Sequence, residues 1–121
     1  MNANRRGMAR KMKGFRDFLP EEQITRQKLI NLVTSIFEKY GFSPIETPAV
    51  ESYQVLTAKA GQEIGKEIFT LTDRAGRKLG LRFDLTVPLA RLLAENKSIS
   101  LPFKRYQVAK VWRQEFGSRN R

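Results

Sequence analysis

The sequence predicts an α+β fold, in which an antiparallel β-sheet is flanked by helices. Three stretches lead to this prediction: an apolar pattern with helical period over residues 21–40, a strand–turn–strand pattern over 67–84, and an aromatic, β-branched stretch over 103–115. The chain has 121 residues, of which 40% are apolar. This is enough for one compact domain and short of a comfortable two.

The first predicted element is an amphipathic helix of residues 21–40. Pro20 suits its first turn, and Gly41 is a natural stop because glycine enters the left-handed conformation without a side-chain clash. The apolar residues that share one face at a period of 3.6 residues are Ile24, Leu29, Leu32, Val33, Ile36, Phe37 and Tyr40.

After this helix we expect an extended segment, FSPIETPAVES, because Pro44 and Pro48 bias the residues before them toward β or polyproline geometry. A short helix is predicted over residues 53–60, ending at Gly61. The segments EIFTLTD and KLGLRFD are then predicted to form a hairpin around a turn of residues 73–77.

A second helix follows the hairpin, with Thr86 as its predicted N-cap, Pro88 in its first turn and fraying near Asn96. The stretch FKRYQVAKVWRQE, residues 103–115, is predicted to form one long strand, because aromatic and β-branched side chains favour strands. The chain ends on GSRNR without a return strand, so we expect it to be a fragment of a longer domain.

Composition excludes several classes of site. The chain contains no Cys and no His, so it cannot by itself build a disulfide scaffold, a zinc site on Cys or His, a thiol nucleophile or a Ser–His–Asp triad. Catalysis must therefore use carboxylates, Lys, Arg, hydroxyls or a metal on oxygen ligands. The apolar runs are far below the roughly 20 residues that cross a bilayer, so we expect no membrane span and no secretory signal. The lack of cysteine fits a cytoplasmic location.

Positive charge is concentrated at the two ends of the chain. Lys and Arg number 23 against 12 Asp and Glu, a net charge of +11. Residues 1–13 carry five cations and no acid, and are predicted to form a flexible basic arm ahead of a single domain of residues 14–121. Six more cations lie within residues 103–121, with Glu115 as the only acid. This excess favours polyanionic partners such as nucleic acid or nucleotide phosphates, and a solvated tail with a solvated strand face explains it equally well.

Asp84 and Thr86, in the segment LRFDLTVP, are the first candidate site residues. Asp84 lies at a predicted strand end and Thr86 at a helix start. A carboxylate there could bind an ammonium group, and a hydroxyl two residues later could share that ligand. Asp and Thr are also ordinary boundary residues, and spacing alone favours that simpler interpretation.

Arg113 and Glu115, in the segment VWRQE, are the second candidate pair. Alternation along a strand points both side chains to one face. There Arg113 could bind phosphate through its guanidinium fork, and Glu115 could accept donors from a base or an amine. Spacing alone favours a cross-strand ion pair on a solvated face.

A third segment of interest is KGFRDFLP, in which we expect Asp17 to cap the first helix. The sequence contains no P-loop or Rossmann glycine pattern.

Four segments, in this order, resemble the histidyl-tRNA synthetase family of class II aminoacyl-tRNA synthetases: KGFRDFLP, FEKYGFSPIETPAVE, GKEIFTLTDRAGRKLGLRFDLTVPLAR and YQVAKVWRQE. The resemblance extends over about residues 13–121. It implies a partial class II catalytic core that runs from motif 1 to the start of motif 2, and a homodimer interface on motif 1, the long helix with FSPIETP. The LRFDLT segment is closer to the archaeal and eukaryotic form than to the LRPEGT of many bacterial members.

The resemblance also implies roles for the candidate residues. Asp84 would hold the α-ammonium of histidine with help from Thr86. Arg113 would contact the ATP α-phosphate and the substrate carboxylate as the catalytic residue, and Glu115 would lie near the adenine. The substrates implied are histidine, ATP with Mg²⁺ and tRNA(His), with no tightly bound cofactor and no metal site on the protein.

Motif 3 and the anticodon-binding domain of the family lie outside this sequence, so we expect the 121-residue chain alone not to adenylate histidine. Exchange of pyrophosphate with ATP at the rate of an intact synthetase would contradict this. Two alternatives stay open. The regulatory subunit of ATP phosphoribosyltransferase resembles the same fold, binds histidine as a sensor and would explain the motifs equally well. A basic nucleic-acid-binding module would show salt-sensitive RNA binding with no response to histidine or ATP.

Overall fold

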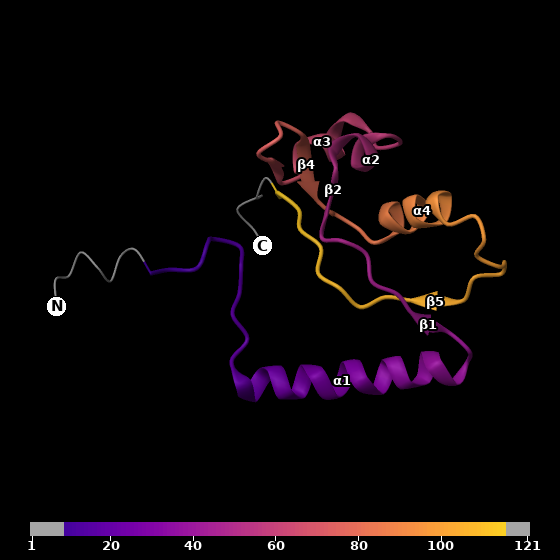
Figure 1. Cartoon of the computed structure of the whole chain (residues 1–121). Coiled ribbons are helices and arrows are strands. Elements are labelled where there is room, and N and C mark those ends of the chain that lie inside the picture. The colour runs from indigo at the N-terminus through magenta and orange to yellow at the C-terminus, as the bar shows by residue number, and fades with distance from the viewer. Residues whose placement is uncertain (1–8, 116–121) are drawn as a thin grey trace, which may run out of the picture. The chain divides into compact units, whose positions relative to one another are not determined.

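The computed structural model describes residues 9–115. The chain divides into two compact units between Tyr40 and Gly41, and the first unit holds helix α1 (Figure 1). In the described part of the chain no helix is long and apolar enough to cross a bilayer. The bounds of the elements are α1 Pro20–Lys39, β1 Ser43–Pro44, β2 Val50–Ser52, α2 Tyr53–Thr57, α3 Gln62–Glu67, β3 Thr70–Thr72, β4 Lys78–Leu81, α4 Thr86–Glu95 and β5 Arg105–Tyr106.

Helix α1 confirms the predicted amphipathic helix. Pro20 is its first residue, and Gly41 follows its end with a φ of 82°, the conformation expected of a glycine stop. No residue of α1 is buried, and its apolar side chains, among them Leu29 and Leu32, are exposed. The other described residues of its unit, 9–19, therefore leave the apolar face uncovered.

The N-terminus of α1 is not capped by the side chain that the sequence predicted. The N-cap is Leu19, whose side chain cannot accept a hydrogen bond, so the predicted cap by Asp17 is wrong. Arg16 instead reaches Glu22 in the first turn, with its Nη2 2.5 Å from Oε1. Because Glu22 also lies at the positive end of the helix dipole, the turn is stabilised without a capping side chain.

The second unit is built on a three-stranded antiparallel sheet in the order β2-β4-β3. The predicted hairpin is confirmed, with Thr72 of β3 opposite Lys78 of β4. In the turn, the Asp73 carboxylate accepts the backbone N–H groups of Ala75 and Arg77 and the Nε–H of Arg77. These hydrogen bonds, that of the Arg77 backbone foremost, hold the pKa of Asp73 below its ordinary value. The turn is therefore stabilised by its own ionised carboxylate.

The core of this unit is small and centres on Leu56, Ile68 and Phe83, which are 1%, 3% and 6% exposed. Strand β4 runs beside it, and Gly80 of this strand lies against the core. A Cβ atom on Gly80 would lie 2.7 Å from Ile68 Cγ2 and 2.8 Å from Leu56 Cδ1. These two side chains therefore fill the space that any larger residue would need.

The short helix after β2 differs from the prediction. The helix predicted over 53–60 stops at Thr57, where α2 ends. Gly61 does not end that helix, because it is the N-cap of a further helix, α3, which the sequence pattern did not reveal. At six residues, α3 is too short to show a clear apolar period.

The predicted N-cap of α4 is also wrong. The N-cap position belongs to Leu85, and Thr86 is already the first helical residue. The Asp84 carboxylate accepts the backbone N–H of Val87 at 3.1 Å and so provides the capping hydrogen bond. A carboxylate favours this end of a helix because the dipole is positive there. The predicted end near Asn96 is confirmed.

The long strand predicted near the C-terminal end is wrong in extent. Only β5 forms a ladder, and it pairs with β1 in parallel, outside the antiparallel sheet. Residues 107–115 continue without regular pairing. The Trp112 N–H donates to Arg82 O at 3.0 Å, whereas the Gln114 N–H donates to Glu67 O at 2.7 Å. Because these acceptors belong to different segments, the stretch has no single partner strand along which a ladder could form.

Gly80→Ala is expected to lower the free energy of unfolding of the chain by about 1–3 kcal/mol, the usual cost of forcing a methyl group into a packed core. Urea unfolding followed by tryptophan fluorescence measures the change. Gly65→Ala is the matched control, because Gly65 lies inside α3 and a Cβ there meets only the movable Tyr53 hydroxyl, at 3.3 Å. The control should be neutral or stabilising, since alanine favours helices. An equal loss from both substitutions would contradict the packing around Gly80.

Candidate functional site

The candidate site lies where residues 107–115 pass the end of β4. Beyond β4 the chain continues through Arg82, Phe83 and Asp84 into α4. The Trp112 N–H donates to Arg82 O at 3.0 Å, and the next residue, Arg113, donates its side-chain Nε–H to Phe83 O at 3.1 Å. The structure thus ties the Arg113 side chain to the backbone directly before Asp84.

Asp84 and Thr86 are in direct contact. The Thr86 hydroxyl donates to Asp84 Oδ2 at 2.7 Å, and the Val87 N–H donates to Oδ1 at 3.1 Å. Each carboxylate oxygen therefore accepts one hydrogen bond, while an ionised carboxylate offers about four acceptor positions. Asp84 is half-buried, so it caps α4 and keeps acceptor capacity for a ligand.

Arg113 is exposed, and its Nε–H bond to Phe83 O is the one side-chain hydrogen bond that it makes within the described residues. In residues 9–115 it forms no ion pair with Glu115 or Asp84. The simpler interpretation of a surface ion pair on this segment therefore has no support in the structure. Both terminal nitrogens of the guanidinium remain available for a bidentate anion.

Glu115 is exposed, and within the described residues it makes no contact with the other three candidates. The structure therefore joins Asp84 to Thr86 and ties Arg113 to the residue before Asp84, whereas no hydrogen bond or ion pair within residues 9–115 links Glu115 to them. Residues 9–115 gather no cluster of three or more carboxylates that could hold a metal ion.

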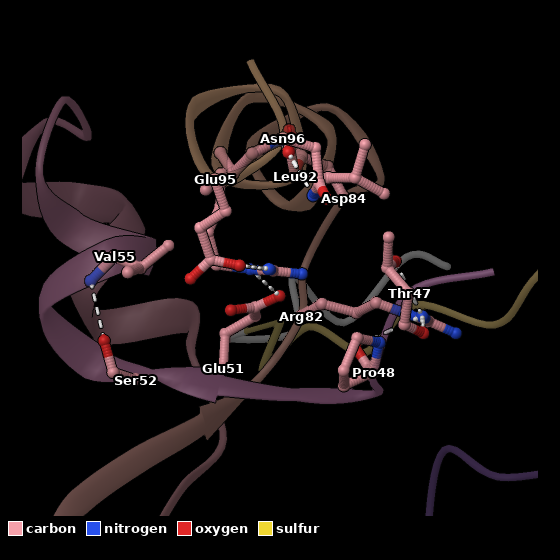
Figure 2. Close-up of polar contacts among 12 residues, drawn as sticks. Thr47, Pro48, Glu51, Ser52, Val55, Arg82, Asp84, Leu92, Glu95 and Asn96 are labelled. Carbon is pink, nitrogen blue, oxygen red and sulfur yellow. Dashed lines mark hydrogen bonds and ion pairs between the residues drawn. The ribbon is translucent and has the colours of Figure 1, made fainter. Parts of the chain in front are cut away.

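Arg82 is the residue of this region that the sequence analysis did not identify. It is 6% exposed, and its guanidinium donates to Thr47 O at 2.7 Å and to Lys110 O at 2.8 Å. Figure 2 shows its side chain extended toward Thr47 and Pro48. The available signal was the position of a cation within the largely apolar run LGLRF, since a charge inside such a run is buried only with a specific set of partners.

A partly buried ion pair joins the sheet to α4. Glu51 of β2 pairs with Arg91 of α4 at 2.8 Å, and Arg91 also contacts Glu95 at 2.9 Å. Burial acts to lower the pKa of Arg91, but the carboxylates of Glu51 and Glu95 outweigh it and raise that pKa above its ordinary value. The pair fixes the helix whose N-terminus carries Asp84.

The chain matches the family model of histidyl-tRNA synthetase over residues 14–121. The histidine–tRNA ligase of Treponema denticola is 52% identical over 105 residues, which are 86% of this chain and 23% of that protein. The histidine–tRNA ligase of Aeropyrum pernix is 48% identical over 111 residues, 90% of this chain and 26% of that protein. The chain thus spans about a quarter of the length of these curated relatives.

Two solved structures share the fold. Histidyl-tRNA synthetase from Nostoc sp. PCC 7120 has a TM-score of 0.80 at 40% identity, over 88% of this chain and 25% of that one. An ATP phosphoribosyltransferase regulatory subunit/histidyl-tRNA synthetase from Bacillus halodurans has a TM-score of 0.79 at 34% identity, over 88% of this chain and 28% of that one. The predicted α+β synthetase fold is confirmed. Since the family model covers every residue of the candidate site, the chain belongs to the histidyl-tRNA synthetase family.

Proposed function

We propose that this chain supplies part of the active site of a histidine–tRNA ligase, which activates histidine with ATP and transfers it to tRNA(His). The observation that carries the proposal is the contact of Arg113 with the backbone of Phe83, directly before Asp84. A cation and an acid that lie near each other without pairing suit the two charged ends of an amino acid. The test is histidine-dependent pyrophosphate–ATP exchange by the full-length product of the gene that encodes this chain.

Asp84 and Thr86 bind the α-ammonium group of histidine in this proposal. Two acceptor positions of the Asp84 carboxylate are taken by Thr86 and Val87, and the others can accept ammonium hydrogens as charge-assisted hydrogen bonds. The Thr86 hydroxyl hydrogen is directed to Asp84. The oxygen lone pairs of Thr86 can therefore accept another ammonium hydrogen.

Arg113 binds the carboxylate of histidine and the α-phosphate of ATP. Activation joins these two anions, because a carboxylate oxygen attacks the α-phosphorus and pyrophosphate leaves. Negative charge accumulates where they meet, and a fixed guanidinium lowers that electrostatic cost. Holding both groups in line for attack removes much of the remaining barrier.

The other assignments complete the proposal. Glu115 accepts a hydrogen bond near the adenine, and Mg²⁺ enters with ATP on its phosphates. Residues 14–121 would form the N-terminal part of the catalytic domain, and most of the basic arm expected of residues 1–13 lies outside the described residues. The net charge of +11 suits the phosphates of tRNA(His). We place the activity in the cytoplasm, whose reducing conditions a chain without cysteine fits.

A second candidate function is histidine sensing, as the regulatory subunit of an ATP phosphoribosyltransferase. The similarity to the Bacillus halodurans protein, whose name includes both functions, favours it. Asp84 and Thr86 would bind histidine in either protein. The functions differ at Arg113, because a sensor transfers no phosphorus to the amino acid. Histidine binding by the full-length protein without any exchange activity would favour the sensor.

The apolar face of α1 is proposed to form a homodimer interface. Leu29→Lys is expected to weaken association of the chain, because it puts a charge on that face, while Gln27→Lys, on the opposite face, is the matched control with the same added charge. Sedimentation velocity over a range of concentrations measures the association. A clean monomer of the unsubstituted chain at high concentration would contradict the interface.

Arg113→Ala is expected to lower the exchange rate of the full-length protein at least about 100-fold, the usual cost of losing one preorganised transition-state donor. Stability should change little, because the side chain is exposed. Lys110→Ala is the matched control, since Lys110 is exposed and lies on the same segment; it should stay within about twofold of the unsubstituted rate, as expected of a side chain outside the site. An Arg113→Ala enzyme with nearly unchanged exchange would remove the phosphate role.

Asp84→Asn is expected to raise the Michaelis constant for histidine about 10-fold or more, because a charge-assisted hydrogen bond to the ammonium is lost. The amide oxygen still accepts the Val87 N–H, so the cap of α4 is kept and stability should change little. Steady-state exchange kinetics at varied histidine measure the effect. Asp73→Asn, in the hairpin turn, serves as the control. Unaltered histidine affinity with normal turnover would count against the ammonium assignment.

A further inference from the structure

Arg82 is a buried cation whose partners come from two distant parts of the chain. Its Nε–H donates to Lys110 O at 2.8 Å, across 28 positions of sequence, and its Nη1 donates to Thr47 O at 2.7 Å, across 35 positions. A weaker contact joins Nη1 to Pro48 O at 3.4 Å. Figure 2 shows the guanidinium reaching Thr47 and Pro48. One side chain thus connects the segment before β2 with residues 107–115.

None of these partners is an acid. Within the described residues Arg82 has no carboxylate at ion-pair distance, in contrast to Arg91, which pairs with Glu51 and Glu95. Burial of a charge without an opposite charge is costly, and hydrogen bonds to carbonyl groups offset only part of that cost. An apolar residue would avoid it. The guanidinium is therefore best explained by its geometry, since its planar fork donates in two fixed directions at once.

Residues 107–115 need such a fixed anchor because they lack a ladder. Arg82 contributes twice to holding them: its side chain binds Lys110 O, and its own carbonyl accepts the Trp112 N–H at 3.0 Å. The Trp112 ring centroid lies 5.9 Å from Arg82 Cζ. The contact of Arg113 with Phe83 O follows one residue later. If residues 107–115 slid relative to Arg82 and Phe83, the Arg113 guanidinium would therefore lose its place next to the backbone before Asp84.

We propose that Arg82 is a positioning residue. It sets the register of residues 110–113 against the backbone of Phe83 and Asp84, and so places the Arg113 guanidinium for the activation step. This role rests on the function proposed above for Arg113. It requires the fork and not only the charge, because two different nitrogens of one rigid plane bind the two carbonyl groups, and the flexible lysine side chain carries only one nitrogen.

The test is a double-mutant cycle on exchange activity in the full-length product of the gene. Arg82→Lys keeps the charge and removes the fork, and should lower kcat about 10-fold or more, as a displacement of about 1 Å can, with the histidine Michaelis constant within about twofold. In an Arg113→Ala background the same substitution should change kcat less than about twofold, because residues that act through each other are not additive. Arg91→Lys is the control, because Arg91 is also partly buried and, within residues 9–115, is not hydrogen-bonded to Arg82 or its partners. The effect of Arg91→Lys on kcat should be the same with and without the Arg113→Ala substitution.

The outcomes separate this proposal from the function on which it rests. An equal loss in both backgrounds would mean that Arg82 acts only on stability, and would overturn the positioning role. No loss from Arg82→Lys beside a large loss from Arg113→Ala would overturn the positioning role alone. No loss from Arg113→Ala would overturn the proposed function, and the positioning role with it.

If the Arg82→Lys protein does not fold, a measurement on the unsubstituted chain still tests the proposal. The Nε–H of Arg82 should exchange with solvent at least about 10-fold more slowly than that of the exposed Arg74, because it is buried and donates to Lys110 O. The NMR signals of the arginine Nε–H groups report both rates. Equal exchange at Arg82 and Arg74 would mean that the fork does not hold the segment, and would overturn the proposal.

Discussion

The hydrogen bond from Arg113 Nε to Phe83 O is the contact on which the candidate site depends. It ties a cation to the backbone directly before an acid, and the described residues show no ion pair between the two. A direct ion pair between Arg113 and Asp84 would use the acceptor and donor positions that a zwitterionic ligand needs. Because the arginine is held by a backbone carbonyl, it keeps its terminal nitrogens and Asp84 keeps part of its carboxylate. This arrangement suits the proposed recognition of both charged ends of one amino acid.

Asp84 combines a structural role with the proposed binding role, and the two do not conflict. Its contact with Val87 caps α4, and its contact with Thr86 orients the hydroxyl that would share the ligand. A carboxylate at the start of a helix is favoured by the dipole, so the cap also keeps the acid fixed in place. Asp84 is thus a boundary residue at the start of α4, and the same contacts would hold it in place for the proposed binding.

Elements whose structure depends on neighbouring residues were predicted correctly from the sequence. Elements whose structure depends on contacts between distant residues were not. Helix α1 and the β3–β4 hairpin carry their own signals, in the period of the apolar residues and in the Asp73 turn. The strand predicted through residues 107–115 fails because its hydrogen-bond partners, Arg82 and Glu67, belong to different segments. The buried contacts of Arg82 were not predicted either, because the carbonyl groups that bind it lie 28 and 35 positions away in the sequence. Local pattern shows a charge in an apolar run, and only the fold shows what it contacts.

Under either proposed function, the half of the site that binds the ammonium group would be the same. Asp84 and Thr86 would need only a fixed helix start, which β4 and the Glu51–Arg91 pair provide in this chain. The two functions would differ in the half of the site that binds an anion. A synthetase must hold that anion in line for attack, and a displacement of about 1 Å there lowers the rate strongly. In this chain that half lies on residues 107–115, which have no ladder to fix them. Among residues 9–115 Arg82 is buried without a carboxylate partner, a cost that a sensor would have no reason to keep, whereas the proposed synthetase would gain from it a fixed place for the Arg113 guanidinium.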